Sequence, residues 1–194
     1  FGRNMVEVLR QPLEEKKVTV ARAKYAIEYP ANFMLVAAMN PCPCGYYNHP
    51  TKECVCSAAS VSRYINRISG PLLDRIDLHV EVTPVALDEI SGTAPAEKSA
   101  AIRERVVAAR ARQAARFAGT NGIHTNAMMN PAMLREFCRL DAACSAMLGR
   151  AMERLDLSAR AYDRIVKVAR TIADLAASPD IRPEHIAEAI NYRS

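Results

Sequence analysis

Four of the six cysteines stand in two closely spaced pairs, and thiols in this arrangement could bind a metal ion. One residue separates Cys42 from Cys44, one separates Cys54 from Cys56, and nine residues join the two pairs. Four thiolates complete the tetrahedral shell of a structural zinc site, and the polar loop between the pairs has few apolar groups to fold around. The spacing therefore predicts a zinc knuckle formed by Cys42, Cys44, Cys54 and Cys56.

Zinc is one of three states that this spacing allows. Zinc sites more often place two residues between paired cysteines, and His49 could replace one thiolate. Unliganded or redox-active thiols and two disulfides are the alternatives, of which a cytosolic protein disfavours the disulfides. Cys138 and Cys144 lie in helical patterns, so we expect them to be buried small hydrophobic residues without a role in the chemistry.

Asn40 is the first of three polar residues that could contact a phosphate. It follows residues 33–39, a continuous apolar run that predicts a strand buried on both faces of a parallel sheet. Open α/β sheets bind ligands at the carboxyl edge, where Asn40 would stand. Its amide could orient a water or a phosphate, or it could cap the loop that follows.

Two arginines are the other candidates. Arg75 lies among apolar residues and beside Asp74 and Asp77, so its guanidinium could stabilise phosphoryl transfer or form a local ion pair. Arg160 falls in the first turn of a predicted helix with Ser158 as its N-cap. A cation and free backbone amides together make a phosphate site there, although an exposed arginine without a function fits the pattern equally well.

The elements that must position these residues fall into two predicted domains, 1–90 and 91–194. The first reads as α/β: a helix at 4–15 that Pro12 should disturb near its end, a hairpin at 18–29 whose tip carries Arg22 and Lys24, a helical stretch at 60–68 and a short strand ending at Val82. The basic tip could be functional or could merely prevent edge aggregation. Residues 91–95 have linker composition, and the helices expected beyond them cover 97–117, 131–139, 141–154, 158–177 and 183–192.

Composition sets outer limits on the function. The 194 residues are 50% hydrophobic, which is enough for a core, and contain neither an apolar run of the ~20 residues that a membrane span needs nor a signal-peptide pattern, so we expect a cytoplasmic protein. A net charge of +5 does not by itself indicate nucleic-acid binding. The segment 97–116 is locally basic, as a solvated helix face often is. Phe1 is not an initiator methionine, so we expect a piece of a longer chain.

Three stretches carry a resemblance to a known family. Residues 38–45 (AMNPCPCG), 68–79 (ISGPLLDRIDLH) and 157–165 (LSARAYDRI) resemble the magnesium-chelatase-like AAA+ ATPases of the ComM and YifB family. The resemblance implies the later part of a AAA+ core, with parallel strands and a hairpin, followed by a helical lid. It also implies that Asn40 is sensor 1, Arg75 the arginine finger acting on ATP of the adjacent subunit and Arg160 sensor 2. The cysteines resemble a zinc-binding insertion, and the hairpin resembles one that touches DNA.

The same resemblance implies a function for the complete protein. Such proteins form homo-oligomeric rings that use ATP and Mg²⁺ to move on branched or single-stranded DNA during natural transformation. This sequence lacks the Gly-rich phosphate loop and the acidic pair that holds magnesium, so the fragment should be inactive alone. Two alternatives remain: the motor subunit of a magnesium chelatase, and a non-enzymatic, zinc-stabilised module that binds a protein partner.

Overall fold

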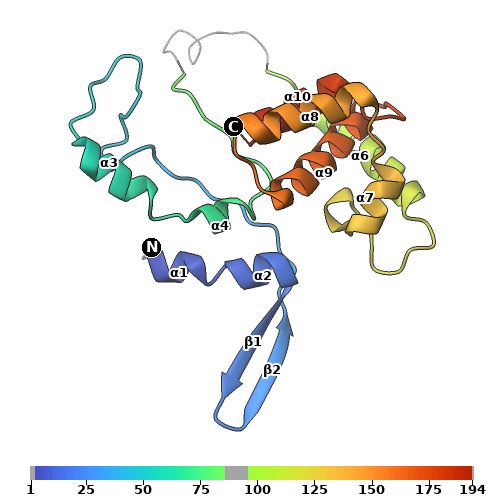
Figure 1. Cartoon of the computed structure of the whole chain (residues 1–194), viewed down its shortest axis with the longest axis horizontal. Coiled ribbons are helices and arrows are strands. Elements are labelled where there is room, and N and C mark those ends of the chain that lie inside the picture. The colour runs from blue at the N-terminus through green and yellow to red at the C-terminus, as the bar shows by residue number, and fades with distance from the viewer. Residues whose placement is uncertain (1–2, 86–95, 194) are drawn as a thin grey trace. The chain divides into compact units, whose positions relative to one another are not determined.

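The computed structural model describes residues 3–85 and 96–193, and the chain divides into two compact units (Figure 1). Unit 1 covers Phe1–Ile76 and unit 2 covers Asp77–Ser194. The linker predicted at 91–95 lies outside the described residues. Each unit is therefore described by itself.

Unit 1 begins with two short helices where the sequence predicted one. The helices are α1 (Arg3–Glu7) and α2 (Arg10–Glu15). They separate at Val8 because the ring of Pro12 clashes with the carbonyl four residues earlier. Pro12 thus disturbs the middle of the predicted helix and not its end. Lys16 ends α2 in a left-handed conformation, with its backbone N–H bonded to the carbonyl of Pro12.

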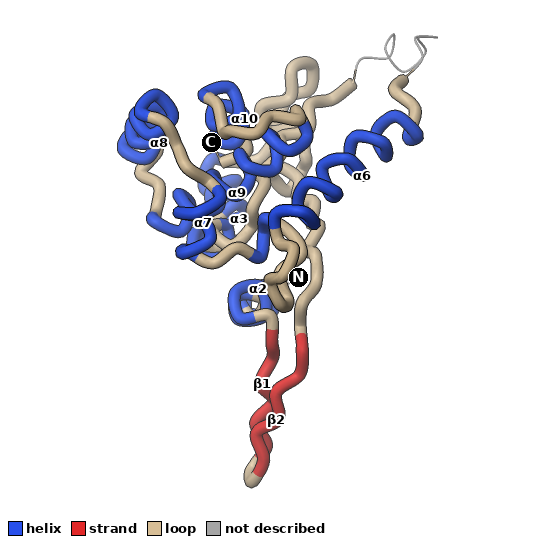
Figure 2. Tube along the Cα trace, turned by 90° about the vertical axis from the view of Figure 1, so that its right-hand side faces the viewer, coloured by secondary structure: helices blue, strands red, loops and turns tan. Residues whose placement is uncertain are grey.

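The predicted hairpin is confirmed, and it supplies the only strands among the residues that the structure describes (Figure 2). Strands β1 (Lys17–Arg22) and β2 (Tyr25–Pro30) pair antiparallel, with Arg22 opposite Tyr25. Two residues, Ala23 and Lys24, therefore form the turn. A cross-strand ion pair joins Lys17 to Glu28 over 2.7 Å.

The buried parallel strand predicted at 33–39 is wrong for the described chain. Residues 33–39 form no strand, and Met34 and Val36 are 87% and 83% exposed. The strand predicted to end at Val82 is also absent, and Val82 is exposed. A strand closes its backbone hydrogen bonds only with neighbouring strands, and in the described residues β1 and β2 pair with each other alone. The α/β expectation for the first domain thus reduces to one hairpin and short helices.

Two further helices complete unit 1. Helix α3 (Ala58–Ile65) starts at Ser57, whose hydroxyl accepts a 3.3 Å hydrogen bond from the Ser60 N–H. Helix α4 (Gly70–Leu73) starts at Ser69 in the same way. Pro71 lies in the first turn of α4, a position that suits proline.

All five helices predicted for the second half are confirmed in unit 2. Three of them begin at a side-chain N-cap, from Asn130, Asp141 and Ser158. A short 3-10 helix, η1, precedes the second. The elements are α6 (Ser99–Arg116), η1 (Asn126–Met128), α7 (Pro131–Phe137), α8 (Ala142–Arg154), α9 (Ala159–Leu175) and α10 (Pro183–Asn191).

Helix α9 is the centre of the unit 2 core. Its buried stripe recurs every four residues, at Ala161, Ile165, Ala169 and Ala173, and α10, α6, η1 and α7 pack against α9, while α8 packs against α10 (Figure 1). Tyr162 directly follows Ala161 but is 41% exposed, so it lies outside this stripe. Within residues 3–85 and 96–193, no helix combines the length and apolar composition that crossing a bilayer requires.

Candidate functional site

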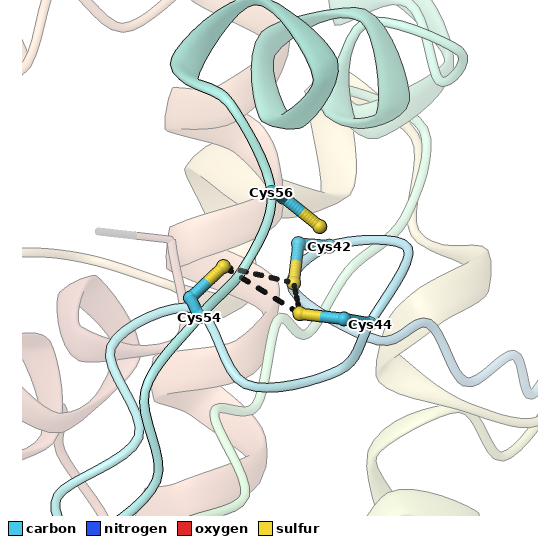
Figure 3. Close-up of side chains that lie close together, drawn as sticks. All are labelled: Cys42, Cys44, Cys54 and Cys56. Atoms are coloured by element: carbon cyan, nitrogen blue, oxygen red, sulfur yellow. Dashed lines mark hydrogen bonds between the residues drawn. The ribbon is translucent and has the colours of Figure 1, made fainter.

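The four paired cysteines converge at the base of one loop (Figure 3). The Cys42 and Cys44 sulfurs are 3.3 Å apart, and the Cys54 sulfur lies 3.7 Å from the first and 3.5 Å from the second. All four Sγ atoms, Cys56 included, lie within 4.8 Å of one another. Residues from the two ends of a long loop thus meet at one point.

The sulfur distances fit a zinc ion better than disulfides. Tetrahedral ZnS₄ geometry with Zn–S bonds of about 2.3 Å places the sulfurs about 3.8 Å apart. A disulfide requires about 2.05 Å, and all six cysteines are free. His49 stands outside the cluster, since its Nδ1 accepts hydrogen bonds from the backbone N–H groups of Thr51 and Lys52 at 3.2 and 3.1 Å. The donor set is therefore Cys42, Cys44, Cys54 and Cys56.

The pKa values of the four thiols differ strongly from one another. Hydrogen bonds from the backbone N–H of Tyr46 and from Cys42 lower the pKa of Cys44 to about 6. A backbone hydrogen bond from Cys56 lowers the pKa of Cys54, but burial and the adjacent sulfurs outweigh it and raise this pKa to about 12. Four neighbouring thiolates repel one another, so binding a divalent cation would release protons from the cluster.

Local backbone turns bring the two cysteine pairs together. Gly45 adopts φ +83°, which a side chain would strain, and its N–H bonds the Cys42 carbonyl at 3.0 Å. Asn48 is also left-handed, and the N–H of His49 bonds the carbonyl of Tyr46 at 3.1 Å. These consecutive turns reverse the chain twice and return Cys54 to Cys42.

Asn40 lies at the entrance to this loop and not at the end of a buried strand. Its side chain is exposed, and its Nδ2 would be 3.9 Å from a Cβ built on Gly45. The structure therefore brings Asn40 near the cysteine loop. The sensor assignment of Asn40 stays a prediction.

Arg75 forms an ion pair, but with a partner that the sequence did not suggest. Its Nη2 contacts the Glu14 carboxylate on α2, and its Nη1 donates to the Pro71 carbonyl at 2.6 Å. Asp77, the expected neighbour, instead pairs with Arg164 on α9. The Arg75 side chain is only 15% exposed, and its Nε is buried without a hydrogen-bond partner.

Arg160 lies in the first turn of α9, as predicted. The Ser158 hydroxyl accepts a 3.2 Å hydrogen bond from the Ala161 N–H, which confirms Ser158 as the N-cap. Arg160 itself is exposed. An exposed cation beside the amides of a 17-residue helix can bind an anion. Arg22 and Lys24 are likewise exposed at the hairpin turn.

The sequence did not predict a buried polar network that the structure shows in unit 2. The Asp174 carboxylate is fully buried and receives hydrogen bonds from Arg116 at 2.8 and 2.6 Å and from Asn126 at 2.8 Å. Arg170, on the same helix, lies 3.2 Å away. The signal available was the spacing of Arg170 and Asp174, four residues apart on the buried side of α9. Arg116 belongs to the basic segment expected to be solvated, yet it ties α6 to α9.

Both halves of the chain match sequence profiles of one family. Residues 1–90 match the family described as "Magnesium chelatase, subunit ChlI", and residues 96–193 match its "subunit ChlI C-terminal". These two matches show that the chain is of the magnesium chelatase type. It belongs to the magnesium chelatase ChlI family.

Several individual proteins are similar to this chain along its whole length. The chain is 42% identical over 195 residues to competence protein ComM of Haemophilus influenzae and 41% identical over 197 residues to YifB of Escherichia coli. YifB of Salmonella typhimurium is 38% identical over 199 residues. Each alignment covers 100% of this chain but 37% of the relative, so the chain spans little more than a third of their length.

Proposed function

We propose that this chain is the nucleotide-sensing part of a AAA+ ATPase that moves DNA, as in the ComM group. The proposal rests on the 42% identity, along the whole chain, to competence protein ComM. The chain itself contains no phosphate-binding loop, so ATP and Mg²⁺ would be held by other residues of the complete protein. The partner would be single-stranded or branched DNA.

Three residues would act on the nucleotide in this proposal. The Asn40 amide would orient the attacking water as sensor 1, and Arg160 would read the phosphate state from the first turn of α9 as sensor 2. Arg75 would be the arginine finger. Its guanidinium is now balanced by Glu14, so it would have to exchange this carboxylate for a phosphate of the adjacent subunit. In this proposal the finger acts in trans on the adjacent subunit, so the complete protein would assemble as a ring of identical subunits.

The hairpin offers a first contact for DNA. Arg22 ends β1 and Lys24 lies in the two-residue turn that follows; both are exposed, and nearby Tyr25 is 75% exposed. Two cations on a narrow ribbon can contact phosphates without reading bases. We assign this contact to Arg22 and Lys24.

The finger assignment is tested in the full-length protein. Arg75→Ala should abolish ATP turnover while ATP binding, measured with a fluorescent analogue, stays within about threefold, because the finger stabilises only the transferring phosphate. Glu14→Gln removes the structural partner of Arg75, and Arg154→Ala removes an unrelated exposed arginine; both should retain turnover. Turnover unchanged in Arg75→Ala, or abolished equally in Glu14→Gln, rejects the assignment.

The cysteine cluster would hold a structural Zn²⁺ that fixes the loop. Protein prepared without chelator should contain about one zinc per chain, and Cys44→Ser with Cys54→Ser should contain none. Cys138→Ser is the matched control, because Cys138 is buried in unit 2 and should leave the zinc content unchanged. Metal-free protein with four alkylatable loop thiols would contradict the site.

A magnesium chelatase motor is the second candidate, and the descriptions of both matching profiles favour it. In that case the ATPase would drive insertion of Mg²⁺ into a porphyrin through partner subunits. The two functions differ in what accelerates ATP turnover. Stimulation of the full-length protein by single-stranded or forked DNA supports the DNA motor, whereas indifference to DNA supports the chelatase.

A further inference from the structure

A cavity in unit 1 lies between the cysteine loop and α3, and no role proposed above uses it. Its volume is about 310 Å³. One wall is the ring of Tyr47, which the loop presents 42% exposed. The other lining residues belong to α3 and its C-cap, Asn66. The residues lining the cavity, here called the Tyr47 slot, are Tyr47, Ala58, Val61, Ser62, Ile65 and Asn66.

The walls of the Tyr47 slot suit a flat heteroaromatic ring. The lining combines the aromatic ring of Tyr47 with the aliphatic side chains of α3, and a planar apolar body can stack on such a ring. Ser62 and Asn66 lie one helical turn apart and are joined by a 3.3 Å hydrogen bond from Nδ2 to Oγ. An amide and a hydroxyl offer both donors and acceptors, which is what the edge of a nucleobase requires.

The charges around the Tyr47 slot favour a phosphate polymer. Between residues 42 and 69 the sequence has three cations, Lys52, Arg63 and Arg67, against one acidic residue, Glu53. All three cations are exposed. Arg63 and Arg67 lie on α3 or directly after it, within a turn of Ser62 and Asn66. Phosphates on either side of a bound base would therefore meet positive charge.

The loop that presents Tyr47 is already ordered. Lys52 lies 4.9 Å from the ring centre of Tyr46, and His49 contacts the same ring edge-on at 5.6 Å. The imidazole of His49 also receives two backbone hydrogen bonds, from Thr51 and Lys52. A wall fixed before binding loses little conformational freedom when a ligand enters.

We propose that the Tyr47 slot binds one base of a single-stranded nucleic acid, stacked on Tyr47, with Arg63 and Arg67 on the flanking phosphates. The proposal rests on the proposed function only for the class of polymer. Stacking on an aromatic ring tolerates every base, because each has a π face. A base inside a duplex is stacked on its neighbours and cannot enter, so the slot selects single strands.

The test is binding of fluorescein-labelled dT20 to the zinc-loaded 194-residue chain, followed by anisotropy. Tyr47→Ala should weaken binding at least about fivefold, and Tyr47→Phe should stay within about twofold, because phenylalanine keeps the stacking face. Tyr162→Ala is the matched control: Tyr162 is 41% exposed, against 42% for Tyr47, but lies on α9 of unit 2. It should bind like the unsubstituted chain.

Two further arms separate stacking from charge. Arg63→Ala with Arg67→Ala should reduce the slope of log K against log salt by about 1.4, or about 0.7 for each lost phosphate contact. A blunt duplex of the same length should compete at least tenfold more weakly than dT20, whereas U20 should compete about equally, since both polymers offer bases and phosphates. Zinc content and circular dichroism of each variant confirm that it has folded.

Several outcomes would contradict the proposal that the Tyr47 slot binds a base. They are absent binding by the unsubstituted chain, unchanged binding by Tyr47→Ala, equal loss in Tyr47→Phe or Tyr162→Ala, and equal competition by duplex. The proposed ATPase is judged separately, by turnover of full-length protein and its Arg75→Ala variant. Retained DNA-stimulated turnover with no effect of Tyr47→Ala on dT20 binding would reject the slot alone.

Discussion

The two units place their apolar side chains very differently. In unit 2, Leu148 and Ile165 are fully buried in one core, whereas in unit 1 Met34 and Val36 remain almost fully exposed. Helices satisfy their backbone hydrogen bonds internally, so an amphipathic stripe is enough to assemble unit 2. An apolar strand is buried only after neighbouring strands and covering helices are in place. Unit 2 is thus stabilised mainly by its core, and unit 1 by turns, caps and the cysteine loop.

The largest expected change in stability comes from removing the buried carboxylate of unit 2. Asp174→Ala leaves Arg170 and Arg116 without their buried counter-ion, which should cost about 3–5 kcal/mol of unfolding free energy. Urea denaturation followed by circular dichroism measures it. Asp180→Ala removes an exposed carboxylate and should change stability by less than about 0.5 kcal/mol. Equal effects of the two variants would contradict the network's role.

The same carboxylate predicts the pH dependence of unit 2. Burial alone would raise the pKa of Asp174, but hydrogen bonds from Arg116 and Asn126 outweigh it and hold this pKa below its ordinary value of 3.8. Its contribution to stability is therefore complete above that ordinary value and is lost as the pH falls through the lower, folded pKa. Melting temperatures of the native chain and of Asp174→Asn, recorded from neutral to acid pH, should converge at the acid end.

Truncating an apolar side chain should destabilise the protein much more in the core of unit 2 than in the exposed segment of unit 1. Leu148→Ala should cost about 2–5 kcal/mol, because it removes buried methyl groups and leaves a cavity. Val36→Ala removes a similar apolar group from an exposed segment and should cost less than about 0.5 kcal/mol. Both values come from the same denaturation experiment. A Val36→Ala cost that approached the Leu148→Ala cost would show that residues 33–39 are buried in solution.

The smallest expected effect tests a helix start. Ser158→Ala removes the hydroxyl that caps α9 and should cost about 1 kcal/mol, while Ser158→Asp should restore most of it. Because Arg160 lies in the same first turn, these variants also perturb its backbone. Amide exchange at Ala161 reports the change directly, and protection equal to that of the native chain would argue against the cap.

Local signals made unit 2 predictable. Ser158, Asn130 and Pro183 mark helix starts within a few residues, so all five helices could be located. The cysteine cluster was predictable for a similar reason, since its spacing in the chain is short. The roles of Asn40, Arg75 and Arg160 in nucleotide sensing stay predictions.

The features that the sequence did not reveal depend on distant residues. Glu14 lies far from Arg75 in the sequence and meets it only in the folded structure, whereas Asp74 and Asp77 were the nearer candidates along the chain. The partners of Asp174 come from α6, η1 and α9, and a charged residue on a buried face breaks the pattern used to find cores. The run 33–39 failed because sheet formation is set by partners and not by the run itself.

The turn between α9 and α10 has a mechanical consequence. Arg170, 3% exposed, donates from inside the core to the carbonyls of Ser178 and Pro179 at 2.7 and 2.8 Å. The N–H of Ser178 in turn bonds the Ala173 carbonyl at 2.8 Å, and Ala177 adopts a left-handed φ of 57°. Three hydrogen bonds thus hold this corner, two from the Arg170 side chain and one from the backbone. Because the clamp begins on α9 and closes on the turn that leads into α10, we expect a tilt imposed at the Arg160 end of α9 to move α10 with it.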